Sequence, residues 1–180
     1  MNSKTRTILM IVLLVVNIGL AIGIYQLIIG DVRLRAQTEE IDNQVINKLK
    51  EIRDAQVAYR QMNGKYAPTF PILIDAMKNG RVAEYKKSGD KDRDPNAVVK
   101  LDTIYTDAME YVFKTNKYPI DNLGFVPPHD TATFSMDTGR VDKNGVILPT
   151  FLVEDPYPFN PKRTLKVGSL DDAIDFGNWK

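Results

Sequence analysis

Hydrophobic and polar residues follow three different patterns along the chain. The first pattern is an apolar run of 23 residues, 8–30, which contains no charged residue. A helix needs about 20 such residues to cross the hydrocarbon core of a bilayer. The run therefore predicts a transmembrane helix at residues 8–30, preceded by a short N-terminal segment at residues 1–7.

A cleaved signal peptide is the alternative interpretation of this run. Ala21, Ile22 and Gly23 form a small-x-small sequence of the kind at which signal peptides are cleaved. The apolar residues continue through Ile29, whereas the apolar region of a signal peptide covers about 7–15 residues. On this length we expect an uncleaved anchor.

Positive charges flank the apolar run on both sides. Lys4 and Arg6 precede it, and Arg33 and Arg35 follow it. Basic residues favour the cytoplasmic side of a membrane, and short N-terminal segments favour it too. We therefore expect a cytoplasmic N-terminus and a domain on the other side, although the two following arginines reduce the difference in charge.

The second pattern covers residues 31–63, which include neither proline nor glycine. Apolar residues recur there at alternating steps of three and four, which is typical of an amphipathic or coiled-coil-like helix. Thr38 and Lys48 interrupt the series, and Asn63-Gly64 supplies a left-handed cap after its end. The members of this apolar seam are Leu34, Ile41, Val45, Ile52, Ala55, Tyr59 and Met62.

We expect the part of the seam after Ile46 to lie on the chain's own domain. Before Ile46, contact with another subunit is an equal alternative. A small domain at residues 64–180 follows, and all ten prolines of the chain lie in it. Prolines and glycines interrupt regular structure, so this third pattern predicts several short elements.

The first of these short elements is a helix between Pro71 and Gly80, since proline suits the first helical turn and glycine the position after the end. Its apolar face is expected to consist of Ile72, Leu73, Ala76 and Met77. Residues 86–96 are charged and are expected to form an exposed loop. Residues 101–113 fit a helix or a strand, and we favour the helix.

The remaining elements are expected to be strands. Residues 131–136 alternate, and turn signals follow at residues 137–139 and 142–145. Residues 146–153 form a second strand, which Pro149 places at an edge or a bulge. Residues 155–161 are a loop and residues 165–167 a last strand. The predicted fold is α+β, with a long helix packed on a small antiparallel sheet.

Composition excludes several classes of function. The chain has no cysteine, a formal net charge of +1 and one histidine, His129. Disulfides and cysteine or histidine metal clusters are therefore excluded, and bulk charge predicts no nucleic-acid partner. His129 precedes Asp130, but no serine or threonine stands in a nucleophile-elbow motif. We expect a protein that is not an enzyme and has no cofactor.

One group of carboxylates is a weak candidate for calcium. Asp90, Asp92 and Asp94 alternate as in an EF-hand loop. Pro95 stands where that loop needs glycine, and Leu101 where it needs a bidentate glutamate. A solvated loop is therefore the favoured interpretation, with calcium binding as the alternative.

The end of the long helix carries a family resemblance. Residues 49–67 read LKEIRDAQVAYRQMNGKYA. This segment resembles the end of the N-terminal helix of type IV pilins and type II pseudopilins, through Ile52, Ala55, Tyr59, Asn63-Gly64 and Tyr66. The resemblance implies a helix packed on a small sheet, with its apolar part in a membrane or a filament core. It also implies a subunit of a secretion, motility or surface-filament complex.

The N-terminus departs from that family, because it has no prepilin cleavage motif and no glutamate before Glu39. The whole chain is also similar to small single-pass proteins of Gram-negative bacteria, a resemblance that implies an inner-membrane location but no activity. We therefore expect a non-enzymatic structural or assembly subunit of the cell envelope, with its domain in the periplasm or outside the cell. Membrane lipid and other envelope proteins are the expected partners, in a homo- or hetero-oligomer.

The residues expected to mediate assembly are Gly19 and Gly23 in the anchor and Leu34, Ile41 and Val45 in the seam. Two glycines four residues apart let membrane helices approach closely. The alternative function is a membrane-tethered binding module that uses the proline-rich, aromatic residues 157–162. Trp179, the only tryptophan, is expected to pack on the domain because burial of a large ring is favourable.

Overall fold

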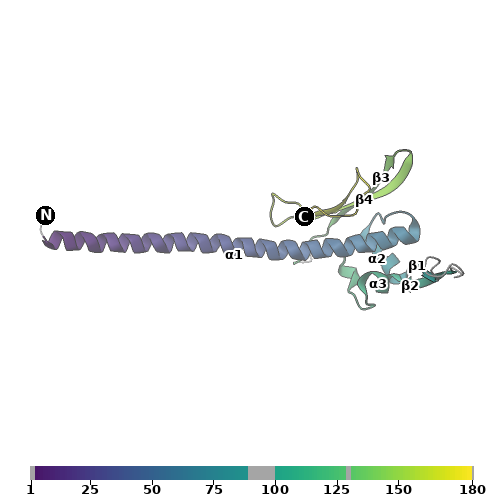
Figure 1. Cartoon of the computed structure of the whole chain (residues 1–180), viewed down its shortest axis with the longest axis horizontal. Helices are drawn as coiled ribbons and strands as arrows, with labels where there is room; N and C mark the ends of the chain where they lie inside the picture. Colours follow the sequence, from purple (N-terminus) through teal and green to yellow (C-terminus); the bar gives the residue numbers. More distant parts are fainter. Residues whose placement is uncertain (1–2, 89–99, 129–130, 180) are drawn as a thin grey trace. The chain divides into compact units, whose positions relative to one another are not determined.

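The computed structural model describes residues 3–88, 100–128 and 131–179 (Figure 1). It divides into two units, Met1–Glu40 and Ile41–Lys180, and we describe each by itself. Helix α1 (Ser3–Asn63) contributes to both. The fold is α+β, as the sequence predicts, with small antiparallel sheets in the second unit.

The first unit consists of the N-terminal part of α1. Its most apolar 18-residue window has a mean hydropathy of 2.7, and none of that window is buried. Among the described residues, this is the one helix long and apolar enough to cross a membrane. Signal sequences and core helices of soluble proteins reach similar length and composition. A core helix would be mostly buried, whereas this window is not buried at all.

The part of α1 in the second unit lies against the core of the domain. Its buried face contains Val45, Leu49, Ile52, Ala55, Ala58 and Tyr59. The helix ends at Asn63, and Gly64 follows with φ +69°, which favours glycine. The Gly64 amide donates to the Arg60 carbonyl at 2.7 Å. The predicted end of the amphipathic helix and its glycine cap are therefore confirmed, as is burial of the seam beyond Ile46.

Helix α2 (Phe70–Asn79) starts with a proline in its first turn, as predicted. Leu73 and Met77 are fully buried, whereas Ile72 is exposed and Ile74 packs against the core in its place. The predicted apolar face was therefore wrong at Ile72. Successive helical residues are about 100° apart around the axis, so Ile72 and Ile74 point to nearly opposite sides of α2.

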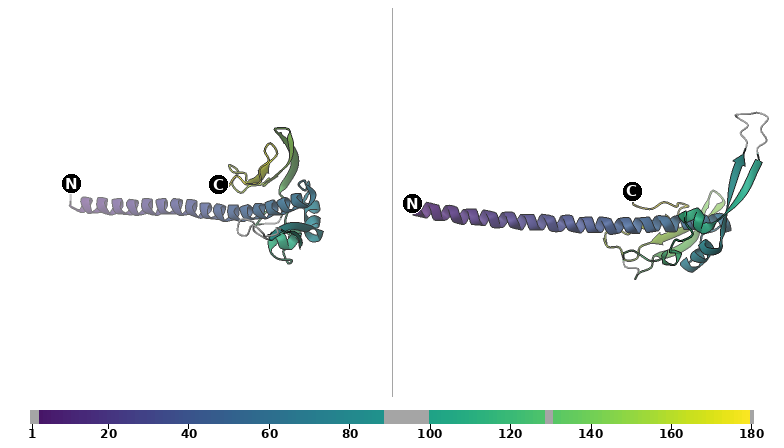
Figure 2. Two further views of the ribbon diagram at one scale, coloured as in Figure 1. Left: turned by 45° about the vertical axis from the view of Figure 1, so that its right-hand side comes forward. Right: turned by 90° about the horizontal axis from the view of Figure 1, so that it is seen from below.

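Strands β1 (Arg81–Ser88) and β2 (Lys100–Asp107) form an antiparallel ribbon, which projects from the second unit (Figure 2). Helix α3 (Ala108–Phe113) and the 3₁₀ turn η1 (Ile120–Asn122) follow. The exposed loop predicted at residues 86–96 was wrong for residues 86–88, which belong to β1. The helix favoured at residues 101–113 was also wrong for its first half, because those residues pair with β1.

The second sheet has the order β3-β4-β5, from β3 (Ser135–Lys143), β4 (Val146–Glu154) and β5 (Lys166–Ser169). Asn144 and Gly145, both at positive φ, connect β3 to β4, so the turn predicted at residues 142–145 is confirmed. The turn expected at residues 137–139 is wrong, because those residues pair with residues 150–152 of β4.

Two other features of this sheet refine the predictions. The first predicted strand, residues 131–136, was placed too early, because β3 begins at Ser135. Pro149 lies in the middle strand, yet the pairing with β5 starts only at Phe151. Among the described strands, β4 therefore has no partner beside Pro149 on that side, which explains how a central strand accepts proline.

The C-terminal residues 176–179 pack beside strand β5. The Gly168 amide donates to the Phe176 carbonyl at 3.2 Å, and the Asn178 amide to the Lys166 carbonyl at 3.2 Å. Trp179 folds over Gly177 and packs, partly buried, against the hydrophobic core. The prediction that Trp179 docks on the domain is confirmed.

Candidate functional site

The apolar run of α1, residues 8–30, consists almost entirely of exposed side chains. At Gly19 and Gly23 an added Cβ atom would meet no atom within 4 Å, so neither glycine is needed for packing inside the described chain. Contact of these glycines with a second helix stays a prediction from their spacing.

The seam residues predicted for assembly divide at the boundary between the two units. Leu34 is 55% exposed, as expected for a residue free to meet a partner. Val45 is only 2% exposed and belongs to the core, and Ile41 is half-buried against that core. The sequence left contact with another subunit open for both residues, whereas the structure packs Val45 inside the domain and Ile41 against its core. Segments more than 80 residues later in the chain cover both.

Those segments form a groove, which we name the Asp155 groove. Its volume is ≈ 220 Å³. Small-molecule sites usually measure about 300–1,000 Å³, so this groove suits one or two side chains rather than a cofactor. Its lining residues are Ile41, Val45, Val126, Pro127, Pro128, Thr131, Ala132, Asp155, Tyr157 and Phe159.

Asp155 is the one acidic residue in the lining of this groove, and it is only 3% exposed. Its Oδ1 atom accepts a hydrogen bond from the Tyr157 amide at 2.9 Å, and its own amide donates to the Leu165 carbonyl at 3.0 Å. Burial raises the pKa of the Asp155 carboxyl, the Tyr157 amide opposes this, and the nearby charge of Asp42 raises the pKa further.

The two carboxylates differ in their partners. Asp42 has the guanidinium of Arg163, with Nη1 at 3.6 Å from Oδ2. For Asp155, the described residues provide an amide but no cationic side chain. A buried carboxylate without a cation is costly when it is ionised, which agrees with the raised pKa of Asp155.

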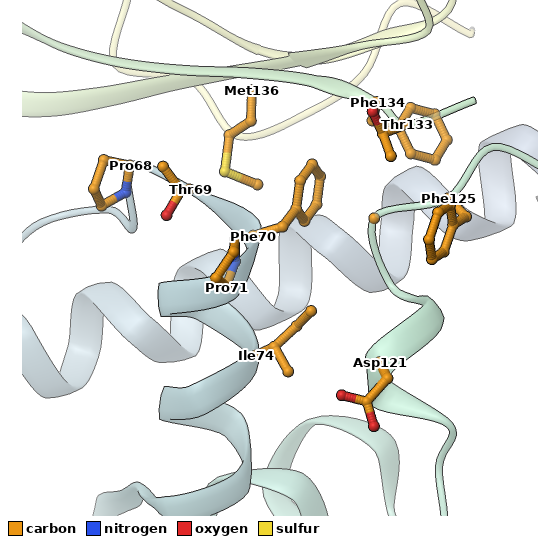
Figure 3. Close-up of a pocket in the computed structure, with 11 residues that line it drawn as sticks. Pro68, Thr69, Phe70, Pro71, Ile74, Asp121, Phe125, Thr133, Phe134 and Met136 are labelled. Atoms are coloured by element: carbon orange, nitrogen blue, oxygen red, sulfur yellow. The ribbon is translucent and has the colours of Figure 1, made fainter. Parts of the chain in front are cut away.

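A second, larger hollow of ≈ 430 Å³ lies between α2 and the segment that leads into β3 (Figure 3). Phe70 points into it from the start of α2, and Met136 and Phe134 approach from the opposite side. Asp121 stands at the rim, where it pairs with Lys78 at 2.6 Å. The lining is mainly apolar, and its polar members are Thr69, Asp121 and Thr133.

A third group is polar and links α1 to the loop before η1. Lys48 Nζ donates to the Tyr118 hydroxyl at 2.9 Å, and that hydroxyl donates to the Glu51 carboxylate. Burial and the neighbouring Glu51 carboxylate raise the pKa of Tyr118, so the phenol keeps its proton. The Phe113 ring stacks on Tyr118 with centroids 4.0 Å apart. These contacts join α1 to the segment between α3 and η1.

Two predicted groups lie outside the described residues. Asp90, Asp92 and Asp94, the weak calcium candidate, are among them, and so is His129. Within the part of the chain that the structure describes, no group of three or more His, Cys, Asp or Glu residues is placed to hold a metal ion.

Sequence reasoning missed Asp155 as a site residue. The sequence Asp155-Pro156-Tyr157 contained a local signal, because aspartate before such a turn often accepts an amide hydrogen bond two residues on. Burial of the same carboxylate gave no such signal. That burial depends on α1 and on residues 126–128 and 131–132, which are distant in the sequence.

Comparison with protein-family models, with curated proteins and with solved structures found no match for this chain. The resemblance to type IV pilins and pseudopilins therefore stays a prediction from the sequence.

Proposed function

We propose that this protein is a membrane-anchored, non-enzymatic assembly subunit of a cell-envelope complex, similar in layout to pilins and pseudopilins. The proposal rests on the most apolar 18-residue window of α1, which has a mean hydropathy of 2.7 and no buried residue. A soluble protein rarely leaves so large an apolar surface in water. A bilayer or the helices of other subunits would cover it.

The continuation of the same helix supports the assembly part of the proposal. Helix α1 extends without interruption to Asn63, and its later residues form part of the domain core. A simple tether needs neither a long helix nor apolar residues outside the core, yet Leu34 is exposed. We assign the assembly surface to Gly19, Gly23 and Leu34. The anchor lies in the bacterial inner membrane, with the domain on the periplasmic or outer side.

The anchor is tested by extraction and mass. Membranes that contain the protein are washed with alkaline carbonate, and the protein is then measured by intact mass spectrometry. We expect it to stay in the pellet with residues 8–30 attached, because the apolar run is long enough to span. A soluble species that begins near Ile24 would show a cleaved signal peptide and end the anchor proposal.

Assembly is tested by native electrophoresis of detergent-solubilised membranes. Leu34→Glu places a charge on the exposed seam, and Ala36→Glu places one about 200° around the same helix, where no seam is present. We expect wild type and Ala36→Glu to migrate as a complex larger than one chain, and Leu34→Glu to migrate as a smaller species. If the wild-type protein itself migrates as a monomer, the assembly proposal fails.

The loop at residues 157–162 supports a second candidate function, a tethered binding module. Tyr157 is 77% exposed and Phe159 is also exposed, so two aromatic side chains of this loop are accessible to a partner. Release with surface filaments when cells are sheared would exclude the tethered module and identify a filament subunit. If the protein stays in the membrane, native electrophoresis separates a subunit of a larger complex from a tethered monomer.

A further inference from the structure

The Asp155 groove carries an inference about how copies of the chain contact one another. Its walls are apolar and include two proline rings and two exposed aromatic side chains. At its surface lies a carboxylate that is almost fully buried and has no cationic partner among the described residues. A suitable occupant combines one positive charge with an adjacent apolar side chain.

The chain contains one exposed segment with this combination close to the anchor. Arg33, Leu34 and Arg35 are consecutive in α1, and all three side chains are exposed. No ion pair of either arginine is present within the described part of the chain. The segment is thus complementary in charge and polarity to the groove.

We propose that residues 33–35 of a second copy occupy the Asp155 groove, with an arginine on the Asp155 carboxylate and Leu34 against the apolar wall. This rests on the proposed assembly function and deepens it by naming the surface that the domain contributes. A guanidinium binds a carboxylate through paired N–H donors, and it also packs well on aromatic faces such as that of Tyr157.

The electrostatics of the groove agree with such an occupant. Burial and the charge of Asp42 raise the pKa of Asp155 by more than the hydrogen bond from the Tyr157 amide lowers it. A guanidinium would favour the ionised form and lower that pKa again. Asp42, which is paired with Arg163, adds negative potential beside the groove and so favours a positively charged occupant.

The contact has a consequence for symmetry. The segment and the groove are different surfaces, so each copy offers both a donor segment and an acceptor groove. Contacts of this head-to-tail kind extend into rings or open filaments instead of closing as a two-fold dimer.

The test uses the full chain in native membranes and exploits its lack of cysteine. One tagged copy carries Leu34→Cys, and a second copy with another tag carries Tyr157→Cys at the groove rim. A short bis-maleimide should link the two tags. The matched control replaces Leu34→Cys by Ala36→Cys, which lies on the opposite side of α1 and should give little of the mixed product.

Charge is tested on both partners of the contact. Asp155→Asn keeps the oxygen that accepts from the Tyr157 amide but removes the negative charge, so the domain should still fold. We expect it to lower the mixed cross-link about tenfold, the effect of losing one charged hydrogen-bonding pair. Arg33→Gln with Arg35→Gln should lower it similarly while leaving the groove unaltered.

The outcomes separate the two proposals. If Leu34→Cys copies link to one another while the mixed product is missing, or if Asp155→Asn leaves the mixed product unchanged, the groove assignment is overturned and assembly stands. If no cross-link forms between any copies and wild type is monomeric on native gels, the assembly function itself falls, and the groove assignment with it.

Discussion

Gln56 provides the sharpest test of how α1 is tied to the rest of the domain. Its side chain is completely buried and makes a pair of hydrogen bonds with one residue beyond the helix end. Nε2 donates to the Ala67 carbonyl at 2.9 Å, and the Ala67 amide donates to Oε1 at 2.9 Å. Gln56→Met removes the side-chain N–H donor and oxygen acceptor that pair with Ala67, but keeps nearly the same side-chain volume.

The expected cost follows from the two backbone groups that the substitution leaves unpaired. Ala67 is also fully buried, so water cannot replace the lost partners. Each buried, unsatisfied group costs about 1–3 kcal/mol, and the similar size of methionine keeps the packing change small. We expect Gln56→Met to lower the free energy of unfolding by about 3 kcal/mol.

The assay is urea unfolding of the full chain in detergent, followed by the emission of Trp179. With a slope near 2 kcal/mol per molar urea, the midpoint should fall by about 1.5 M. Gln61→Met is the matched control, because Gln61 donates to the Ala83 carbonyl at 2.8 Å from an exposed position. Water can replace that bond, so the control should change stability by less than about 0.5 kcal/mol.

A result in which Gln56→Met and Gln61→Met cost equally little, with unchanged slopes, would refute the reasoning. It would mean that the Ala67 backbone groups find other partners, and that the pair of hydrogen bonds contributes nothing specific to the position of the segment after α1.

Three other predictions concern the domain. Gly168→Ala should destabilise it by at least about 2 kcal/mol in the same urea assay, because φ is +79° and the new Cβ would lie 2.2 Å from the Phe151 carbonyl oxygen; a midpoint equal to wild type would contradict this. The raised pKa of Asp155 means that the folded state holds its proton to higher pH than the unfolded state, so this group's contribution to stability falls as pH rises above the unfolded pKa. Asp155→Asn should therefore gain stability relative to wild type as pH rises through that window, and a difference that does not vary with pH would argue against burial as the cause. Trp179 emission should be blue-shifted in the folded protein and move to the red in urea, whereas emission of a fully hydrated indole before unfolding would show that the tail is free.

Local signals in the sequence were enough for the features that depend on a few adjacent residues. Asn63-Gly64 predicted the end of α1, and Asn144-Gly145 predicted the turn between β3 and β4. In both places the backbone needs a positive φ, and glycine or asparagine accepts it at low cost. The proline in the first turn of α2 acted in the same way.

The ribbon of β1 and β2 was missed for a physical reason. Most of its side chains with described exposure lie in solvent, including those of Tyr85 and Tyr105, so the alternation of apolar and polar residues that marks a half-buried strand is weak. The lysines at the end of β1 also favoured a loop. Pairing between the two strands supplies the order there, and pairing cannot be read from either segment alone.

The candidate site depended most on contacts that are distant in the sequence. The seam predicted that one face of α1 would be apolar, but it could not show where the domain would begin to cover that face. The boundary falls after Glu40, so Leu34 stays exposed while Val45 is buried. The Asp155 groove requires residues 126–128, 131–132 and 155–159 to pack beside Ile41 and Val45 of α1.

The dependence of the core on both ends of the domain has a consequence for biosynthesis. Leu49 and Ile52 on α1 share their core with Phe151, Val153 and Val167, about 100 residues later. At about 5–20 residues per second, the ribosome needs roughly 5–20 s to supply those strands after the helix has emerged. Throughout that interval the helix presents an uncovered apolar face, which a chaperone or a previously completed neighbour must shield if the nascent chain is to avoid aggregation.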